Sequence, residues 1–323
     1  MPEVQDPSER PIQVGLLLID GFALMSYAAF IEPLRAANNL AGHELYAWRH
    51  YSIDGGEVRA SNGVGLLADG QVGAPVDLDL LMVFAAGYPA EFRNTQCMGW
   101  LRKIARQGTI VGGVSGGPYL LARAGLLSGY RATIHWEHAA AFRDEFPDLE
   151  LESNLFIIDR RRITCAGGTA ALDLAIKLIE DAHGPELAQS VGEWFIRAEP
   201  RESSRDQRPN LADRYGTRDV RLLSALEAME GSIETPLPRA ELAAIAGCSL
   251  RHLERLCHTH LGKGTSEIYM EIRLRHAAQL LRSTDLSVTE VSVISGFRTP
   301  GHFSRRFSQQ FGIMPSHLAQ RHR

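Results

Sequence analysis

The fold of the carboxy-terminal part of this chain is decided by a pattern that occurs twice, first as Glu241-Leu-Ala-Ala-Ile-Ala-Gly247 and again as Glu290-Val-Ser-Val-Ile-Ser-Gly296. Both copies begin with an acid, space their apolar residues identically and close on a glycine. When the register is slipped by one residue after that glycine, the match continues. The further matched pairs are His252 with His302, Leu253 with Phe303, Arg255 with Arg305, Cys257 with Phe307, Leu261 with Phe311, Gly262 with Gly312, and Ser266 with Ser316. One structural module is therefore present twice.

Each copy predicts two short helices around a glycine turn, because its apolar residues recur at three- and four-residue spacing. This is the pattern of a helix-turn-helix, whose second helix lies in the major groove of DNA. Ser249 and Thr299 are the expected N-caps of the two second helices, and Pro300 is the first helical residue after Thr299. The expected helices span about 239–246 and 249–261 in the first copy, 288–295 and 299–311 in the second, with a long helix at about 266–281 between them.

The charge distribution favours DNA as the partner of these modules. The whole chain has a formal net charge of -4, yet no Asp or Glu follows Glu290. Arginines in that segment are Arg298, Arg305, Arg306, Arg321 and Arg323. A basic region on an acidic protein predicts a surface that faces phosphates. The alternative is a pair of helical hairpins with solvated arginines, and two copies in register argue against it. The candidate DNA contacts are Ser249, Arg251, His252, Arg255, Arg298, Thr299, His302, Arg305 and Arg306.

Residues 216–323 resemble the DNA-binding domain of AraC-type transcriptional regulators. The motifs behind this resemblance are Leu242-Ala-Ala-Ile-Ala-Gly-Cys-Ser249, Arg251-His-Leu-Glu-Arg255, Arg273-Leu-Arg-His-Ala277, Gly296-Phe297, His302-Phe-Ser-Arg-Arg-Phe307 and Pro315-Ser316. One departure is Thr265-Ser266, where the family usually has a proline. The resemblance implies sequence-specific binding to double-stranded DNA by a homodimer, with activation as the expected output and RNA polymerase as a candidate partner.

The segment before residue 200 predicts a separate α/β domain. At 323 residues and 45% hydrophobic, the chain is long enough for two cores. Apolar strands alternate with helices from Ile12 onward, which favours a doubly wound, flavodoxin-like sheet at residues 12–199. Residues 200–215 are polar, contain two prolines and are expected to be a linker. A polar start, no apolar run of about 20 residues and four scattered cysteines predict a cytoplasmic protein without a membrane span, metal or cofactor.

The sequence Gly113-Val-Ser-Gly-Gly117 fits the G-x-S-x-G pattern of a nucleophile elbow, in which a polar side chain sits at a sharp turn between strand and helix. An α/β-hydrolase is not favoured, since the nearest histidine, His135, follows Ser115 too closely and no acid lies between them in the expected order. A Ser-His hydrolase or amidase that uses Ser115 and His135, with an appended DNA-binding domain, is nevertheless the alternative function.

Residues 12–198 resemble the class I glutamine amidotransferase-like fold, in its ThiJ/PfpI-like branch. The resemblance rests on Gly113-Val-Ser-Gly-Gly117, Ala132-Thr-Ile-His-Trp136 and Cys165-Ala-Gly-Gly-Thr-Ala-Ala-Leu-Asp173. It implies that Ser115 replaces the catalytic cysteine, that His135 matches the histidine, and that the acid position falls near Met25 or Ser26, where no carboxylate is present. A serine without an acid to orient its histidine is a poor nucleophile. We therefore expect a binding pocket and not an enzyme.

The expected effector is a small amine or amino acid, because similar regulators respond to amino acids or to quaternary amines such as glycine betaine and carnitine. Backbone donors at the elbow favour a carboxylate, and aromatic walls favour a cationic amine. Phe22, Tyr27, Phe30, Tyr119 and Trp136 are the aromatics that could converge there, although most of them are as well explained as ordinary core. The candidate ligand-binding residues are Met25, Tyr27, Ser115, Gly116, His135, Trp136 and Gly167.

Overall fold

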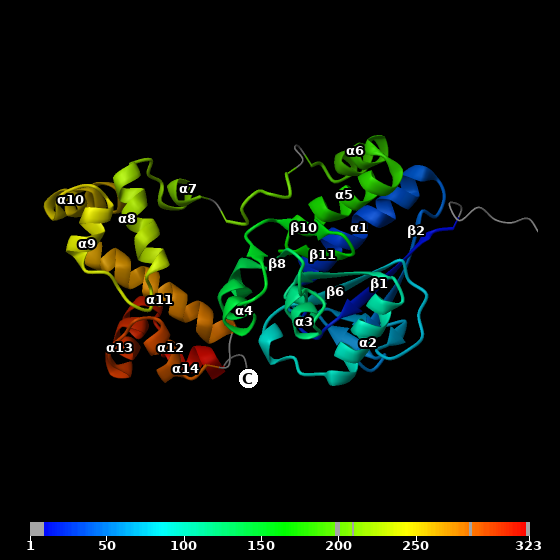
Figure 1. The fold of residues 1–323 in the computed structure, drawn as a ribbon, viewed down its shortest axis with the longest axis horizontal. Coiled ribbons are helices and arrows are strands. Elements are labelled where there is room, and N and C mark those ends of the chain that lie inside the picture. The colour runs from blue at the N-terminus through cyan, green and yellow to red at the C-terminus, as the bar shows by residue number, and fades with distance from the viewer. Residues whose placement is uncertain (1–9, 198–200, 209, 284–285, 321–323) are drawn as a thin grey trace, which may run out of the picture. The chain divides into compact units, whose positions relative to one another are not determined.

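The chain folds into two compact units, Met1–Gln207 and Arg208–Arg323. The computed structural model describes residues 10–197, 201–208, 210–283 and 286–320 (Figure 1). Each unit has hydrophobic clusters of its own, as expected from the length and composition of the chain. In the described part of the chain, no helix combines the length and the apolar character needed to cross a membrane.

The amino-terminal unit is built on a seven-stranded sheet with the order β10-β11-β7-β6-β1-β2-β5. Its strands are β1 (Ile12–Leu18), β2 (Tyr46–Ser52), β5 (Gly70–Gln71), β6 (Leu80–Ala85), β7 (Ile110–Ser115), β10 (Phe156–Asp159) and β11 (Arg162–Cys165). Only the β10–β11 pair is antiparallel. From β1 the chain adds strands first on one side and then on the other, which confirms the predicted doubly wound sheet.

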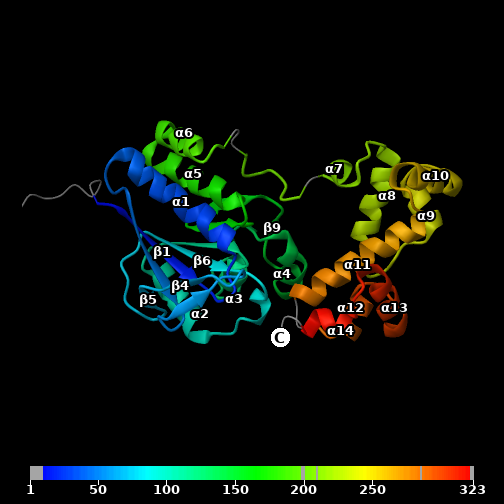
Figure 2. The same ribbon diagram turned by 180° about the vertical axis from the view of Figure 1, so that it is seen from behind.

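Helices cover both faces of this sheet, as Figures 1 and 2 show. One face is covered by α1 (Leu24–Ala41), α5 (Ala170–His183) and α6 (Pro185–Trp194), and the other by α2 (Thr95–Arg106), α3 (Gly117–Arg123) and α4 (Ala139–Glu145). Within β1, Leu16 and Leu18 belong to the first core, whereas Leu17 belongs to the second. Successive side chains of a strand point to opposite faces, so a strand buried on both sides is apolar throughout.

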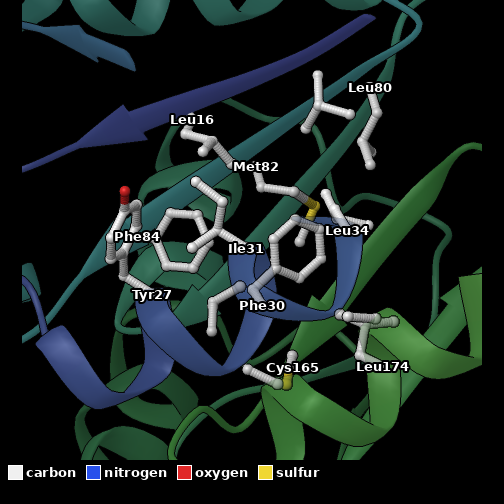
Figure 3. Packing of buried hydrophobic residues seen from close by; sticks show 14 of the residues in the cluster. Leu16, Tyr27, Phe30, Ile31, Leu34, Leu80, Met82, Phe84, Cys165 and Leu174 are labelled. Atoms are coloured by element: carbon white, nitrogen blue, oxygen red, sulfur yellow. The ribbon is translucent and has the colours of Figure 1, made fainter. Parts of the chain in front are cut away.

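Helix α1 packs on the sheet through residues spaced three and four apart. Tyr27, Phe30, Ile31 and Leu34 lie against Leu16, Leu80, Met82 and Phe84 of the central strands, with Cys165 and Leu174 beside them (Figure 3). Phe30 and Phe84 meet edge to face, with ring centroids 5.8 Å apart. This spacing places all four helix residues on one side, which explains why the helix was evident from sequence.

The segment predicted as a linker, 200–215, forms contacts with both units. Residues 200 and 209 lie outside the described residues. Residues 201–207 run beside residues 153–155, which precede β10 in the amino-terminal unit, and the Leu155 N–H donates to the Ser203 carbonyl over 2.9 Å. Helix α7 (Leu211–Tyr215) belongs to the carboxy-terminal unit, where Arg214 forms an ion pair with Glu230. The connection between the units is therefore shorter than the polar composition suggested.

The carboxy-terminal unit is all helical and has two cores. After α7 its helices are α8 (Val220–Gly231), α9 (Arg239–Ile245), α10 (Leu250–Leu261), α11 (Thr265–Ser283), α12 (Val288–Ile294), α13 (Pro300–Phe311) and α14 (Pro315–Gln320). Helix α11 contributes Ile268 and Ile272 to the first core and Ala277 and Leu281 to the second. The helices predicted for the two repeats are confirmed to within about two residues, the range within which helix ends are defined.

Candidate functional site

The two recognition helices, α10 and α13, begin and end in the same way. The Ser249 hydroxyl accepts a hydrogen bond from the His252 N–H, and the Thr299 hydroxyl accepts one from the His302 N–H, each over 3.3 Å. Each helix ends at a glycine in the left-handed conformation, Gly262 or Gly312. Caps of this kind satisfy backbone groups that the helix leaves free, so both predicted N-caps are confirmed.

Each recognition helix buries one face and exposes the other. Leu253 and Cys257 of α10 and Phe303 and Phe307 of α13 are buried. The residues named as candidate DNA contacts lie on the opposite sides. Eight are exposed, and His252 is half-buried. The exposed residues are Ser249, Arg251, Arg255, Arg298, Thr299, His302, Arg305 and Arg306. Arg321 and Arg323 lie outside the described residues. Cationic side chains free of the core are available to phosphates and base edges.

The turn of the second module is fixed by Arg273 of α11. Its Nε donates to the Ser295 carbonyl over 2.9 Å, its Nη2 donates to the Gly296 carbonyl over 2.5 Å, and its guanidinium lies 4.3 Å from the Phe297 ring centroid. Gly296 has a φ of 73°, and a Cβ there would lie 2.4 Å from the Ile233 carbonyl oxygen. The closing glycine of the repeat is therefore required by both backbone conformation and space.

Thr265 explains why the missing family proline is tolerated. It begins α11, is fully buried, and donates from its hydroxyl to Glu254 over 2.6 Å. That bond ties the start of α11 to the recognition helix α10, a connection that proline could not form.

The amino-terminal unit contains the predicted elbow between β7 and α3. Ser115 is buried and has a φ of 60°, which is rare for any residue other than glycine. The glycines around it permit close approach, because a Cβ on Gly117 would lie 2.1 Å from the Val83 carbonyl oxygen and one on Gly113 would lie 2.5 Å from the Pro118 nitrogen. Strain of this kind is typical of a nucleophile elbow.

His135 lies beside the elbow, and its Nδ1 accepts a hydrogen bond from the backbone. Its backbone N–H donates to the Ser115 carbonyl over 3.3 Å. Its Nδ1 accepts a hydrogen bond from the Glu137 N–H over 3.3 Å, so the ring proton is on Nε2. Burial lowers the pKa of His135, opposed by the Glu137 carboxylate, whose Oε2 is 3.9 Å from Nδ1. A catalytic histidine needs its proton on Nδ1, held by an acid, and Nε2 free to accept one.

The position expected for a catalytic acid is occupied by Ser26. This buried hydroxyl accepts a hydrogen bond from the Gly168 N–H over 2.7 Å, across 142 residues of sequence. Gly167 lies between the two serines, since a Cβ built on it would be 2.8 Å from both Ser26 Oγ and Ser115 Cβ. The site therefore combines Ser115, His135, Ser26 and Gly167, with a hydroxyl where a carboxylate would be needed for catalysis.

Comparisons with known proteins agree with both halves of this geometry. Residues 242–321 match a helix-turn-helix domain family, and residues 13–181 match the DJ-1/PfpI family. The chain is 43% identical over 300 residues to the HTH-type transcriptional regulator CdhR of Pseudomonas aeruginosa, covering 93% of this chain and 89% of that protein. It is 41% identical over 310 residues to the HTH-type transcriptional regulator GlxA of Rhizobium meliloti, covering 96% of each.

The chain belongs to the AraC family of DNA-binding transcriptional regulators and carries an amino-terminal DJ-1/PfpI domain. Among solved structures, an AraC family transcriptional regulator from Pseudomonas putida superposes with a TM-score of 0.53 at 28% identity, over 57% of this chain and all of that one. The curated relatives named above are regulators, and the two helix-turn-helix modules of this AraC-family regulator are its DNA-binding domain.

The structure brings together most of the predicted ligand-binding residues of this regulator. Gly116 follows Ser115, and its N–H donates to the Ala85 carbonyl over 2.7 Å. This backbone donor was expected to bind an anion, but it is already paired. Trp136 is 38% exposed, and its ring centroid lies 5.3 Å from that of His135. Met25 is 57% exposed in the first turn of α1.

Tyr27 packs in the core, in agreement with the alternative that most of the named aromatics are ordinary core residues. Its hydroxyl lies 2.8 Å from Nε2 of His50, whose Nδ1 is 3.1 Å from Asp69. Burial raises the pKa of Tyr27 to about 12, and the ring packs in the core. The other buried aromatics named with it, Phe22, Phe30 and Tyr119, are core residues too. Trp136 alone of the five is substantially exposed.

Two polar residues at the site were not evident from sequence as ligand-site residues. Ser26 was noted only as a missing acid, and Gln207 lay in the predicted linker, although its side chain contacts the segment that carries His135. The sequence around these residues does not predict either contact, because the contacting residues are far apart in the chain.

Proposed function

We propose that this regulator is a ligand-controlled activator that acts as a homodimer, and that its effector is a small amino acid or quaternary amine bound beside Ser115, Gly116, His135, Trp136 and Gly167. The observation that carries the proposal is the hydrogen bond from the Glu137 N–H to Nδ1 of His135. It removes the base from a turn that otherwise has the shape of a catalytic elbow. The geometry remains useful for binding after its chemistry has been lost.

The polar part of the proposed site suits the carboxylate of such a ligand. His135 is neutral with a proton on Nε2, so it can donate a hydrogen bond without bringing a charge. Among the described residues, the Ser115 hydroxyl has no other partner and can donate as well. Two neutral donors in a mostly buried site favour an acceptor group, since an unpaired buried donor is costly.

The cationic part of the ligand would lie on Trp136. Its indole is the partly exposed aromatic at the site, next to His135. A trimethylammonium or ammonium group is attracted to the face of an indole, and tryptophan is the best of the aromatic side chains for this purpose. A zwitterion with the two charges a few bonds apart therefore matches the donors and the ring together.

DNA binding would be controlled through the arrangement of paired domains. The two recognition helices of one chain would read successive segments of the major groove, and a homodimer would present two such pairs. A ligand can shift this arrangement only if it binds one form of the dimer more tightly than the other. The bound form would then recruit RNA polymerase at the promoters it occupies.

Thermal unfolding of the full chain against a panel of amino acids, glycine betaine, carnitine and polyamines tests the proposal. All four tryptophans, Trp48, Trp100, Trp136 and Trp194, lie in the amino-terminal unit, so intrinsic fluorescence follows that unit alone. A ligand at about 100 times its Kd adds about 2.7 kcal/mol of stability. The midpoint should rise by about 5 to 10 °C in a unit of this size.

Matched variants locate the ligand. His135→Gln and Trp136→Leu should abolish the shift or weaken it strongly, whereas Trp194→Leu, which changes an exposed tryptophan on α6, should leave it intact. A shift that persists in both site variants would move the ligand elsewhere. Turnover of acyl esters or amides that disappears in Ser115→Ala would instead establish the hydrolase alternative.

A further inference from the structure

Residues 201–207, which we call the strap, connect the DJ-1/PfpI unit to the DNA-binding unit. The strap makes a turn, closed by the Arg205 N–H donating to the Glu202 carbonyl over 3.1 Å, and lies beside residues 153–155. The Leu155 N–H donates to the Ser203 carbonyl over 2.9 Å, and the Gln207 N–H donates to the Ser153 carbonyl over 3.2 Å. Asn154 and Asp206 form an antiparallel bridge between these contacts. The strap is thus fixed to the first unit up to its last residue.

Gln207 anchors the carboxy-terminal end of the strap to the segment that carries His135. Its Oε1 accepts from the Trp136 N–H over 2.7 Å. Its Nε2 lies 2.8 Å from the Ile134 carbonyl and 2.9 Å from the Thr133 hydroxyl, and it also donates to the Asn154 carbonyl over 3.0 Å. One side chain therefore forms hydrogen bonds with the residue before His135 and with the residue after it. The residue after it, Arg208, belongs to the DNA-binding unit.

Arg201 anchors the other end of the strap to the second loop of the pocket. Its Nη2 donates to the Thr169 hydroxyl over 2.8 Å, and its Nε donates to the Asp173 carboxylate over 2.8 Å. Asp173 is buried in the first turn of α5 and also pairs with Arg197. Thr169 directly follows Gly167 and Gly168, which contact Ser115 and Ser26. The strap is therefore attached to both loops that flank the elbow.

We propose that the strap couples the pocket to the DNA-binding unit, with Gln207 and Arg201 as the positioning residues at its two ends. This inference rests on the proposed function, since it assumes that the pocket controls DNA binding. A change at Ser115 or His135 displaces segment 133–136 relative to segment 167–169, and a strap bound to both must follow or detach. Since the strap leads into Arg208, either response alters the freedom of the DNA-binding unit, which is a coupling free energy between two sites.

A double-mutant cycle in the full chain tests the coupling without an identified ligand. The operator is first recovered by selection from a random pool of DNA duplexes, and its affinity is measured by fluorescence anisotropy. His135→Ala perturbs the pocket segment without removing any strap contact of Gln207. We expect this change to alter operator affinity at least about fivefold in the natural chain. In the Gln207→Leu background the same change should alter it less than about twofold, because the connection is broken.

Additional variants separate coupling from general damage. Gln189→Leu, an exposed glutamine on α6 bonded to Glu193, is the matched control and should preserve the full effect of His135→Ala. Arg201→Met removes the Thr169 contact while Arg197 still neutralises Asp173, and it should reduce the coupling from the other end. Hydrogen exchange of the Trp136 amide should accelerate about tenfold in Gln207→Leu.

Two outcomes would overturn the proposed coupling through the strap, and both can be distinguished from failure of the proposed function. Equal effects of His135→Ala in both backgrounds, or no effect in the natural chain, would show that the strap does not transmit the state of the pocket. Failure of the proposed function has separate signs: no operator is selected, or no ligand raises the unfolding midpoint in a manner that depends on His135. If a ligand raises the unfolding midpoint but the effects of His135→Ala and Gln207→Leu are additive, the coupling through the strap is refuted and the proposed function is not.

Discussion

The two units of this regulator build their functional surfaces in opposite ways. The candidate DNA contacts are exposed side chains on two helices, and each helix separates them from a buried face that holds the fold together. The residues of the proposed ligand site are largely buried and come from segments as distant as Ser26, Ser115, His135 and Gly167. In the first case function and stability are carried by different residues of one helix. In the second, the residues proposed to bind the ligand also hold the fold together, so the two roles would be harder to change separately.

The largest effect is expected where a recognition helix meets its core. Phe303 is fully buried, with its ring centroid 5.1 Å from Phe297 and 5.4 Å from Phe307. Phe303→Ala should lower the free energy of unfolding of the carboxy-terminal unit by about 3 to 5 kcal/mol. Urea unfolding followed by far-ultraviolet circular dichroism measures this loss. His302→Ala, one residue away on the exposed side, should change it by less than about 0.5 kcal/mol. Similar losses of unfolding free energy in both variants would contradict the division of this helix into a buried and an exposed face.

The proposed ligand site should not permit such a separation of stability from binding. Gly167 has a φ of 86°, and a Cβ there would lie 2.8 Å from Ser26 Oγ and from Ser115 Cβ. Gly167→Ala should therefore lower the stability of the amino-terminal unit by about 1 to 3 kcal/mol, measured by tryptophan fluorescence in urea. It should also weaken any ligand that binds there. Gly168→Ala, with no atom close to its Cβ, is the matched control for backbone strain without crowding. An unchanged ligand response in a destabilised Gly167→Ala would mean that the site lies elsewhere.

On the DNA side, Arg255→Ala and Arg305→Ala should each weaken operator binding by about 1 to 3 kcal/mol if they contact base edges, while the unfolding free energy stays constant. These arginines occupy matching positions of the two repeats and are both exposed. The salt dependence of affinity should fall more for a residue that contacts phosphate. Titration of labelled operator at several salt concentrations distinguishes the two roles. Unchanged affinity in both variants would remove these helices as the reading surface.

A smaller effect is expected from pH, and it originates in the buried His138. Burial, with a further contribution from the neighbouring His135, lowers the pKa of His138 to about 3. An unfolded histidine has a pKa of about 6.5, so between these values only the unfolded chain binds the proton. The contribution of neutral His138 to the free energy of unfolding is therefore fully present above about pH 6.5. It falls as the pH drops toward 3, by up to about 1.4 kcal/mol per pH unit.

The measurement compares urea unfolding at pH 7 and pH 5, again by tryptophan fluorescence. His138→Gln should lose less stability between these values than the natural chain, because the titrating group is gone. His302→Gln, on the exposed face of α13, serves as the control. An identical loss in the natural chain and in His138→Gln would mean that other groups dominate acid destabilisation.

Much of this fold was predictable because its signals are local. The repeat, the capping residues Ser249 and Thr299, and the glycines that end each helix specify the helix-turn-helix modules through contacts only a few residues apart. Continuous apolar runs identified β1, β6 and β7 in the same way. The short strands β3 (Glu57–Arg59), β4 (Gly65–Leu67) and β5 were not predicted, because two or three residues show no period. Helix α6, which directly follows α5 after Gly184, was missed as well.

The candidate site was only partly predictable. The strained turn at Ser115 and the nearby histidine follow from the glycine pattern and the family resemblance. By itself, the sequence determined the two helix-turn-helix modules, the alternation of strands and helices, and the absence of a carboxylate at the expected acid position. Tertiary structure alone decided the rest: the proton on Nε2 of His135, the Ser26–Gly168 bond, the burial of Tyr27 and the attachment of Gln207. These depend on contacts between segments distant in sequence, which no local periodicity encodes and which form only when the sheet brings the segments together.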